Sequence, residues 1–423
     1  ALEDGENIGL RNAAVEALVA IGPDAVGATI EASRRLDSDA RKLAVEVLGG
    51  IADARGTAAL VRMLADGDLN VRVTVAEALG NAALAGETSR AMAIAALVSE
   101  LADRDTLFKL AVFGSLARLE ARLPWSVFEA HVDDPVLRRQ VISATARSRD
   151  PAAVRVLARA TGDPSPIARE AIVILGDLIA ESASEGATLD CARAELTKNT
   201  ERNARRAAAD TDDPRGRAGA LLVLGLVGAA EDVPLLIDAL GDDDVAERAE
   251  IALRIAGAKA GRPLLAAASA GTSRVRVAAL TLVASLDVVS VTQVRSALRR
   301  ALGDSSLEVV QCAVEALGSR GDARDLRRMG QRVGDGDERV AAAAAKSVFE
   351  LAARHVEAAR SLLRSRGLWR DSPTLGCILL GAIASVQPMR EADARLLQSA
   401  LANPEPRVRR AAIEALAQGG GDA

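Results

Sequence analysis

One short sequence phrase recurs along the whole chain, and this repetition constrains the fold more than any other feature. Its clearest copy is residues 68–80, and another is residues 405–416. Copies return about every 30 residues, which is typical of a stacked repeat architecture. When each copy is anchored on the slot that Arg72 occupies, most spacings are 29 to 37 residues, and the one after Ala168 is 49. The anchors are Arg11, Arg41, Arg72, Lys109, Arg138, Ala168, Arg217, Ala246, Arg276, Val310, Ala341, Pro373 and Arg409.

Each copy of the phrase is predicted to form a helix. Apolar residues lie one position before the anchor and three, six, seven and ten positions after it, as Val71, Val75 and Leu79 do around Arg72. This 3.6-residue periodicity places the apolar side chains on one buried stripe. A short acidic side chain often lies four positions before the anchor, where it can accept the free N–H groups of the first helical turn. These residues are Asp37, Asp68, Asp105, Asp134, Asp213, Asp242 and Asp337.

Glycine recurs eight positions after the anchor, and we expect its small size to let a neighbouring helix approach. A second apolar segment, of about three helical turns, lies between successive phrases, for example at residues 57–65 and 231–240. The repeating unit is therefore a pair of helices, and the chain holds about 12 or 13 of them. The recurring glycines are Gly49, Gly80, Gly176, Gly225 and Gly318.

Over nearly the whole chain, the phrase resembles the HEAT repeat in its short bacterial form, named after the phycobilisome lyases. The resemblance implies an all-α fold, a right-handed superhelical solenoid of about 12–13 HEAT-like helix pairs whose anchor helices line the concave face. It also implies an ion-pair ladder along the stack, broken in the second half of the chain where several anchors are not basic. The ladder would join Asp68, Asp105 and Asp134 to Arg72, Lys109 and Arg138, and the departing anchors are Ala168, Ala246, Val310, Ala341 and Pro373.

The long spacing after Ala168 indicates an irregular insert. We predict an N-terminal array at residues 1–181, an insert or degenerate repeat at 182–212, and a C-terminal array at 213–423. Solenoid ends normally carry polar caps, but the first anchor has no partner helix before it and the chain stops soon after the last phrase. We therefore expect this chain to be part of a longer polypeptide.

The composition is that of a soluble protein, with 49% hydrophobic and 26% charged residues. Only 1% of residues are aromatic, so Ala, Leu and Val must fill the core. Three widely spaced cysteines favour small buried side chains in a reducing compartment, which we expect to be a bacterial cytoplasm. No apolar run is long enough to predict a membrane span.

Signals for catalysis and cofactors are absent from the sequence. His131 and His355 are the only histidines, and neither has a second ligand at metal-binding spacing. There is no glycine-rich phosphate loop and no His positioned for a nucleophile triad. The sequence therefore predicts neither an enzyme nor a bound cofactor. Phycobilin lyases share the repeat, so a lyase-type accessory protein that binds a small molecule or chromophore is an alternative.

The slot five positions after each anchor is expected to face the concave groove. This slot is charged towards the chain ends, as at Glu77 and Glu315, and apolar in the middle, at Val173, Leu222 and Ile251. If these apolar residues are exposed, they form a patch that binds a helix or peptide of another protein, and the glutamates orient it. The alternative is that the 182–212 insert folds over them and buries them. The sequence thus favours a non-catalytic protein-binding scaffold, with a role in bacterial signalling or assembly.

Basic residues gather near the C-terminal end. Residues 320–370 hold 12 Lys or Arg against 7 Asp or Glu, although the whole chain has a net charge of −5. Such a stripe could meet an acidic protein, a nucleic acid or an anionic membrane surface, and the alternative is an ordinary solvated helix face. The overall acidic balance argues against general nucleic-acid binding. The first cluster is Arg324, Arg327, Arg328 and Arg332 on one predicted helix, and Arg360, Arg364, Arg366 and Arg370 follow it.

Most of the aromatic side chains lie within one stretch of about 20 residues, where the anchor spacing lengthens to 37. Because aromatic side chains bury a large area each, we expect them to form a local core that fills an irregular join. We expect Trp369, near Pro373, to fill a similar gap. The cluster is Phe108, Phe113, Trp125 and Phe128.

Overall fold

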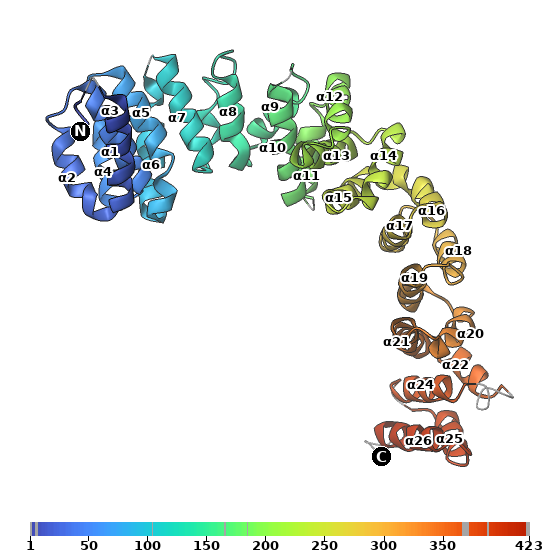
Figure 1. Cartoon of the computed structure of the whole chain (residues 1–423). Helices are drawn as coiled ribbons and strands as arrows, with labels where there is room; N and C mark the ends of the chain where they lie inside the picture. The colour runs from blue at the N-terminus through green and yellow to red at the C-terminus, as the bar shows by residue number, and fades with distance from the viewer. Residues whose placement is uncertain are drawn as a thin grey trace. The chain divides into compact units, whose positions relative to one another are not determined.

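The computed structural model describes residues 2–4, 7–103, 105–164, 166–183, 185–365, 372–386 and 389–419. In this part of the chain the secondary structure consists of α-helices and short 3-10 helices, with no β-strand (Figure 1). The chain divides into two compact units, residues 1–227 and 228–423. The predicted insert, residues 182–212, therefore lies inside unit 1.

Each of the thirteen anchors lies in its own α-helix, which we term a first helix. In unit 1 the first helices are α1 (Ile8–Ile21), α3 (Ser38–Ile51), α5 (Leu69–Leu79), α7 (Thr106–Arg118), α8 (Arg138–Ala144), α10 (Ile167–Glu181) and α13 (Pro214–Val227). In unit 2 they are α15 (Ala246–Ala256), α17 (Ser273–Ser285), α19 (Leu307–Arg320), α21 (Glu338–Arg354), α24 (Pro373–Ala384) and α26 (Pro406–Gly419).

Second helices follow most first helices and form a second layer. In unit 1 they are α2 (Pro23–Ser33), α4 (Ala54–Met63), α6 (Glu87–Ser99), α9 (Pro151–Ala160) and α11 (Gly186–Arg193). In unit 2 they are α14 (Val233–Asp238), α16 (Gly261–Ala270), α18 (Val291–Ala301), α20 (Asp325–Gly330), α22 (Val356–Leu363) and α25 (Glu391–Ala400). Within each unit successive first helices pack on one another, and successive second helices do so in most repeats. Each unit is therefore a segment of an α-solenoid, as the sequence predicts, and in unit 2 the two layers are plain in Figure 1.

The 182–212 segment contains one helix that fits the repeat and one that is additional. Helix α11 packs on α9 and so continues the second-helix layer, whereas α12 (Lys198–Ala208) packs on α13 and α10. Asn203 of α12 donates hydrogen bonds to the carbonyl oxygens of Thr161 (2.9 Å) and Asp163 (3.1 Å). The extra helix explains why the anchor spacing after Ala168 is 49 residues.

Most of the acidic residues four positions before the anchors cap the first helices, as predicted. Asp37 accepts a hydrogen bond from the N–H of Ala40 at 2.8 Å, and Asp105 accepts one from Phe108 at 2.9 Å. These bonds satisfy donors that the first helical turn leaves free. Asp68, Asp213 and Asp337 accept backbone N–H groups of their own first helices in the same way. Asp134 and Asp242 instead accept N–H groups of the turns that precede α8 and α15, so the capping prediction is wrong for these two.

The ion-pair ladder exists, but its acidic partner differs from the predicted one. Arg72 pairs with Asp103 at 2.6 Å, so the prediction that the capping residues Asp68, Asp105 and Asp134 form the ladder is wrong. The true partner lies just before the next first helix and holds the turn as well, since Asp103 accepts the N–H of Asp105 at 2.7 Å. Asp105, two positions further along the chain, caps α7 instead by accepting the N–H of Phe108. The other pairs in unit 1 are Arg41 with Asp66 (2.9 Å) and Arg138 with Asp163 (2.7 Å).

In unit 2 the ladder is partly retained. Arg276 pairs with Asp304 at 2.7 Å. Where the anchor is Val310, the corresponding Asp335 pairs instead with Arg332, at 2.9 Å. The ladder is thus interrupted where a departing anchor predicts a break.

Recurring glycines allow close contact between first helices, as predicted. A Cβ atom at Gly49 would lie 2.8 Å from the Cβ of Ala78, and one at Gly318 would lie 2.8 Å from the Cβ of Ser347. The closest approach is between α10 and α13, where a Cβ at Gly176 would lie 2.3 Å from the Cα of Gly219. Small residues on both sides therefore set the helix spacing.

The aromatic cluster forms a local core between α7 and α8, where a short 3-10 helix (Trp125–Val127) stands in place of a regular second helix. Phe108, Phe113 and Phe128 are fully buried. His131 packs edge-on to the Phe113 ring at 5.4 Å, and burial together with the nearby charge of Lys109 lowers the pKa of this imidazole. The prediction of a core that fills an irregular join is confirmed here, and Trp369 lies outside the described residues.

Candidate functional site

A groove of about 590 Å³ crosses the first-helix layer of unit 1. Its walls come from α5, α7 and α8, and the lining positions on each long wall follow helical spacing. Since residues three and four apart share one side of a helix, each wall is one continuous stripe. The lining residues are Leu69, Asn70, Val73 and Glu77 of α5, Leu107, Leu110, Ala111, Gly114 and Arg118 of α7, and Gln140 of α8.

The groove is apolar near the start of the two long helices. Leu107 is 64% exposed, although its neighbour Phe108 is fully buried in the core. Leu69, Val73 and Leu110 line the same part of the groove and are half-buried. When a partner covers partly exposed leucine and valine side chains, their burial stabilises the complex. Full burial of one such side chain contributes about 1.5–3 kcal/mol.

The opposite end of the groove is polar. Arg118 donates hydrogen bonds to the backbone carbonyl of Glu77 (2.7 Å) and to the hydroxyl of Ser115 (3.0 Å), which ties α7 to α5. The Glu77 side chain is exposed and lines the groove. A bound segment would therefore meet an apolar surface at one end and two groups of opposite charge, Glu77 and Arg118, at the other.

The predicted central patch is not brought together as expected. Leu222 is fully buried, with 0% of its side chain exposed, so its assignment as a partner-binding residue is wrong. The physical reason is that α13 is buried from Gly219 to Leu226 and packs against both α10 and the extra helix α12. Val173 in unit 1 and Ile251 in unit 2 are half-buried.

The remaining predicted residues lie in unit 2, where Arg332 is half-buried and the others are exposed. Glu315 lies on α19 and accepts a hydrogen bond from Gln311 at 2.9 Å. Arg324, Arg327 and Arg328 lie at the exposed side of α20. Arg332 differs from them, because its guanidinium donates to the Leu302 carbonyl and pairs with Asp335.

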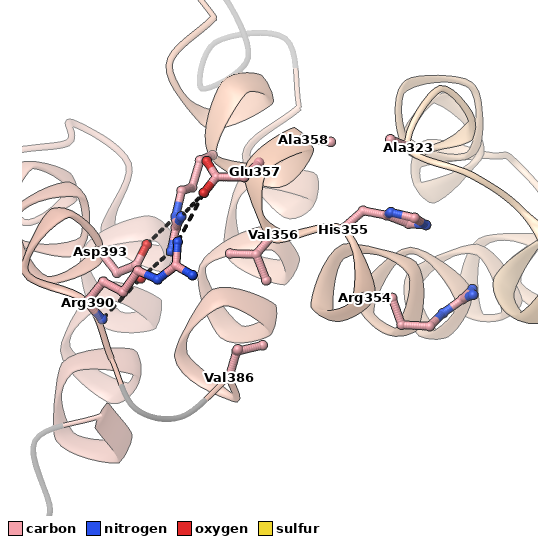
Figure 2. Close-up of a pocket in the computed structure, with 10 residues that line it drawn as sticks. Ala323, Arg354, His355, Val356, Glu357, Ala358, Val386, Arg390 and Asp393 are labelled. Carbon is pink, nitrogen blue, oxygen red and sulfur yellow. Dashed lines mark hydrogen bonds and ion pairs between the residues drawn. The ribbon is translucent and has the colours of Figure 1, made fainter.

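A second cavity, of about 370 Å³, lies in unit 2 beside α22 and α25. Figure 2 shows Glu357, Arg390 and Asp393 on one side of it and Arg354 and His355 on the other. The charged groups largely satisfy one another. Arg360 is 6% exposed and pairs with both Asp393, 3% exposed, and Glu357, and these ion pairs raise the pKa of the guanidinium. Glu357 also pairs with Arg390 at 3.3 Å. The charged side chains beside this cavity therefore form a structural ion-pair network.

The sequence also contains a signal for the groove, which an analysis of the apolar periodicity alone misses. The slot two positions before the anchor is polar or charged in most repeats, for example Asn70 and Arg274. In two consecutive repeats it is Leu107 and Val136, which are 64% and 56% exposed. An exposed apolar residue in a slot that is otherwise polar indicates a surface that binds a partner.

Among the described residues no group of three or more His, Cys, Asp or Glu side chains could hold a metal ion. None of the helices described is long and apolar enough to cross a membrane.

Comparison with known proteins identifies one repeat family. Residues 261–348, from the start of α16 into α21, match the family model of HEAT repeats. The resemblance noted from the sequence is therefore confirmed for this segment, while the short bacterial subtype is not. No curated protein matches the sequence.

Two solved structures are similar along almost the whole chain, both at 17% identity. One comes from work on a phosphorylation switch that controls the interaction between cadherin and beta-catenin; it covers 99% of each chain with a TM-score of 0.41. The other is an engineered protein that covers 99% of this chain and 97% of its own, with a TM-score of 0.37. Scores this low do not transfer a function or a partner.

Proposed function

We propose that this protein is a non-catalytic HEAT-repeat scaffold that binds another protein through the first-helix layer of unit 1. The observation that carries the proposal is the groove between α5 and α7, with Leu107 64% exposed at its edge. HEAT-type solenoids stack repeats into extended surfaces, and such surfaces suit an elongated partner. We further propose the short bacterial repeat type, a cytoplasmic role in signalling or assembly, and a position within a longer polypeptide.

The partner that fits the groove is a helix or a short peptide with a few apolar side chains. Groove-bound helices present apolar residues at three- and four-residue intervals, and the groove walls have the same spacing. Covering Leu107, Val73 and Leu110 would supply the affinity. The exposed Glu77 and Arg118 at the polar end would select the direction in which the segment lies.

The test is a Leu107→Asp variant used as bait in a lysate of the source organism. A carboxylate in the groove loses apolar contact and must be desolvated, which we estimate costs at least about 2 kcal/mol and raises Kd about 30-fold. The matched control is Leu84→Asp, because Leu84 is 80% exposed and is not among the groove residues. A protein retained by the wild type and the control but lost from Leu107→Asp supports the proposal. Equal retention by both variants contradicts it.

A further inference from the structure

Three arginines lie on one side of α20 in unit 2. Arg324, Arg327 and Arg328 are spaced three and four residues apart, so they share a helix face, and all three are exposed. None of the three guanidinium groups has an ion pair or hydrogen bond within the described part of the chain. In this respect they differ from the arginines of the ladder.

The acidic residues nearest to α20 are already occupied. Arg299 of α18 pairs with Asp325 at 2.7 Å and with Asp322 at 3.0 Å. Asp325 is fully buried, and these hydrogen bonds raise the pKa of Arg299. Because both carboxylates are used inside the structure, they do not neutralise the arginines on the outer side of α20.

The same charge continues across the neighbouring second helices. Arg300 of α18 and Arg364, directly after α22, are exposed and have no ion pair among the described residues. Within α16, α18, α20 and α22, Glu357 is the exposed acidic residue, and it is held by Arg360 and Arg390. The surface is therefore positive in a chain whose net charge is −5. We term it the arginine face, and it comprises Arg300, Arg324, Arg327, Arg328 and Arg364.

Folding stability does not explain this arrangement. Like charges four residues apart on a helix, as at Arg324 and Arg328, destabilise it by roughly 0.2–0.5 kcal/mol. Exposed arginines also contribute no packing of the core. A cluster that costs some stability and that no internal acid neutralises is the pattern expected of a binding surface.

The chemistry of the face selects among anionic partners. Its four helices contain no aromatic side chain, so it has no platform for stacking nucleotide bases. The one large apolar side chain exposed on these helices is Val291, which is too little for insertion into a lipid interface. Guanidinium groups bind carboxylates in a bidentate geometry, with two parallel N–H···O hydrogen bonds.

We propose that the arginine face is a second binding surface, separate from the groove, and that it takes an acidic protein segment rich in Asp and Glu. Carboxylates of this segment pair with Arg324, Arg327 and Arg328, and Arg300 and Arg364 extend the contact to the neighbouring helices. Such contacts are exposed, so the complex weakens as salt concentration rises.

The test measures binding of fluorescent poly-glutamate to the full chain by anisotropy at low ionic strength. The variant Arg324→Glu/Arg327→Glu/Arg328→Glu should bind at least about tenfold more weakly, because three exposed ion pairs are lost and replaced by repulsion. A matched triple reversal changes the net charge equally but lies on the second-helix side of unit 1. It consists of Arg35→Glu, Arg62→Glu and Arg155→Glu, at exposed residues.

The proposal is supported if the α20 variant loses poly-glutamate while the unit 1 variant keeps it. Circular dichroism and the Leu107-dependent capture should be unchanged in the α20 variant, which separates this result from misfolding and from failure of the groove. Equal weakening in both triple variants would mean that net charge alone drives binding, and the proposal would then be wrong. It would also be wrong if the wild type did not bind poly-glutamate. Tighter binding of duplex DNA or of phosphatidylserine vesicles than of poly-glutamate at the same ionic strength would contradict it as well.

Discussion

The contact between α10 and α13 gives the sharpest test of how this sequence sets its packing. Replacing Gly176 by Ala places a Cβ atom 2.3 Å from the Cα of Gly219, where the nearest atoms are backbone and cannot rotate away. Ordinary carbon contacts are about 3.5–4.0 Å. The two backbones would have to move apart at this point by more than about 1 Å.

The expected magnitude follows from two opposing effects. Alanine in a helix interior is favoured over glycine by about 1 kcal/mol. An extra methyl group in a well-packed contact costs about 1–3 kcal/mol, and a clash with backbone lies at the upper end of that range. We therefore expect Gly176→Ala to destabilise unit 1 by about 2 kcal/mol net. For a unit of this size that corresponds to a fall of about 4–8 °C in its thermal unfolding.

Gly27 is the matched control, since it lies inside α2, is exposed, and would have nothing within 4 Å of an added Cβ. Gly27→Ala should therefore raise the stability of unit 1 by up to about 1 kcal/mol. Thermal unfolding followed by circular dichroism, with hydrogen exchange to assign the transition to α10 and α13, measures both. If Gly176→Ala were as stable as Gly27→Ala, the interpretation of the recurring glycine as a spacing device would be refuted.

Further predictions concern the charged and titratable groups of unit 2. Arg360→Ala should destabilise unit 2 by about 3 kcal/mol or more, because it leaves the carboxylate of Asp393 buried without its partner; replacing both residues by leucine should cost less in the same urea titration. Burial raises the pKa of Asp304, but the N–H of Ser306 and the Arg276 ion pair outweigh it and lower the pKa overall. The stability from this pair is therefore present above the ordinary Asp pKa and lost as pH falls through the lowered value, so Asp304→Asn should cost about 1 kcal/mol at pH 7 and progressively less as the pH falls below the ordinary Asp pKa. Burial also raises the pKa of the Cys312 thiol, so iodoacetamide at neutral pH should modify it slowly in the folded protein and rapidly in urea, as mass spectrometry of the labelled peptide can show.

Features that depend on neighbouring residues in the chain could be predicted from the sequence. The first helices follow from apolar periodicity, and the caps follow from a carboxylate within two or three residues of its donor, as at Asp37 and Asp105. The small residue at Gly176 also marks a real close contact. These features require only that a helix forms and stacks on a similar helix.

Features that depend on the packing of distant elements could not be predicted in the same way. Leu222 occupies a slot that is exposed at Glu77 and Glu315, but packing of α13 against α10 and α12 leaves it fully buried. The ladder was expected to use the capping residues Asp68, Asp105 and Asp134, whereas the carboxylate that pairs with Arg72 is that of Asp103. The first error comes from treating every repeat as geometrically equal. The second comes from choosing the capping carboxylate over the one that lies two positions before it.

Photo-cross-linking from inside the groove tests the central claim most directly. A photoreactive amino acid at Asn70, which lines the groove, and another at Leu84, which is not among the lining residues, would be activated in the presence of captured partner protein. We predict that the partner is cross-linked from position 70 and not from position 84, and that Leu107→Asp abolishes the product. A product formed from position 84 alone, or one unaffected by Leu107→Asp, would contradict the assignment of the groove as the binding site.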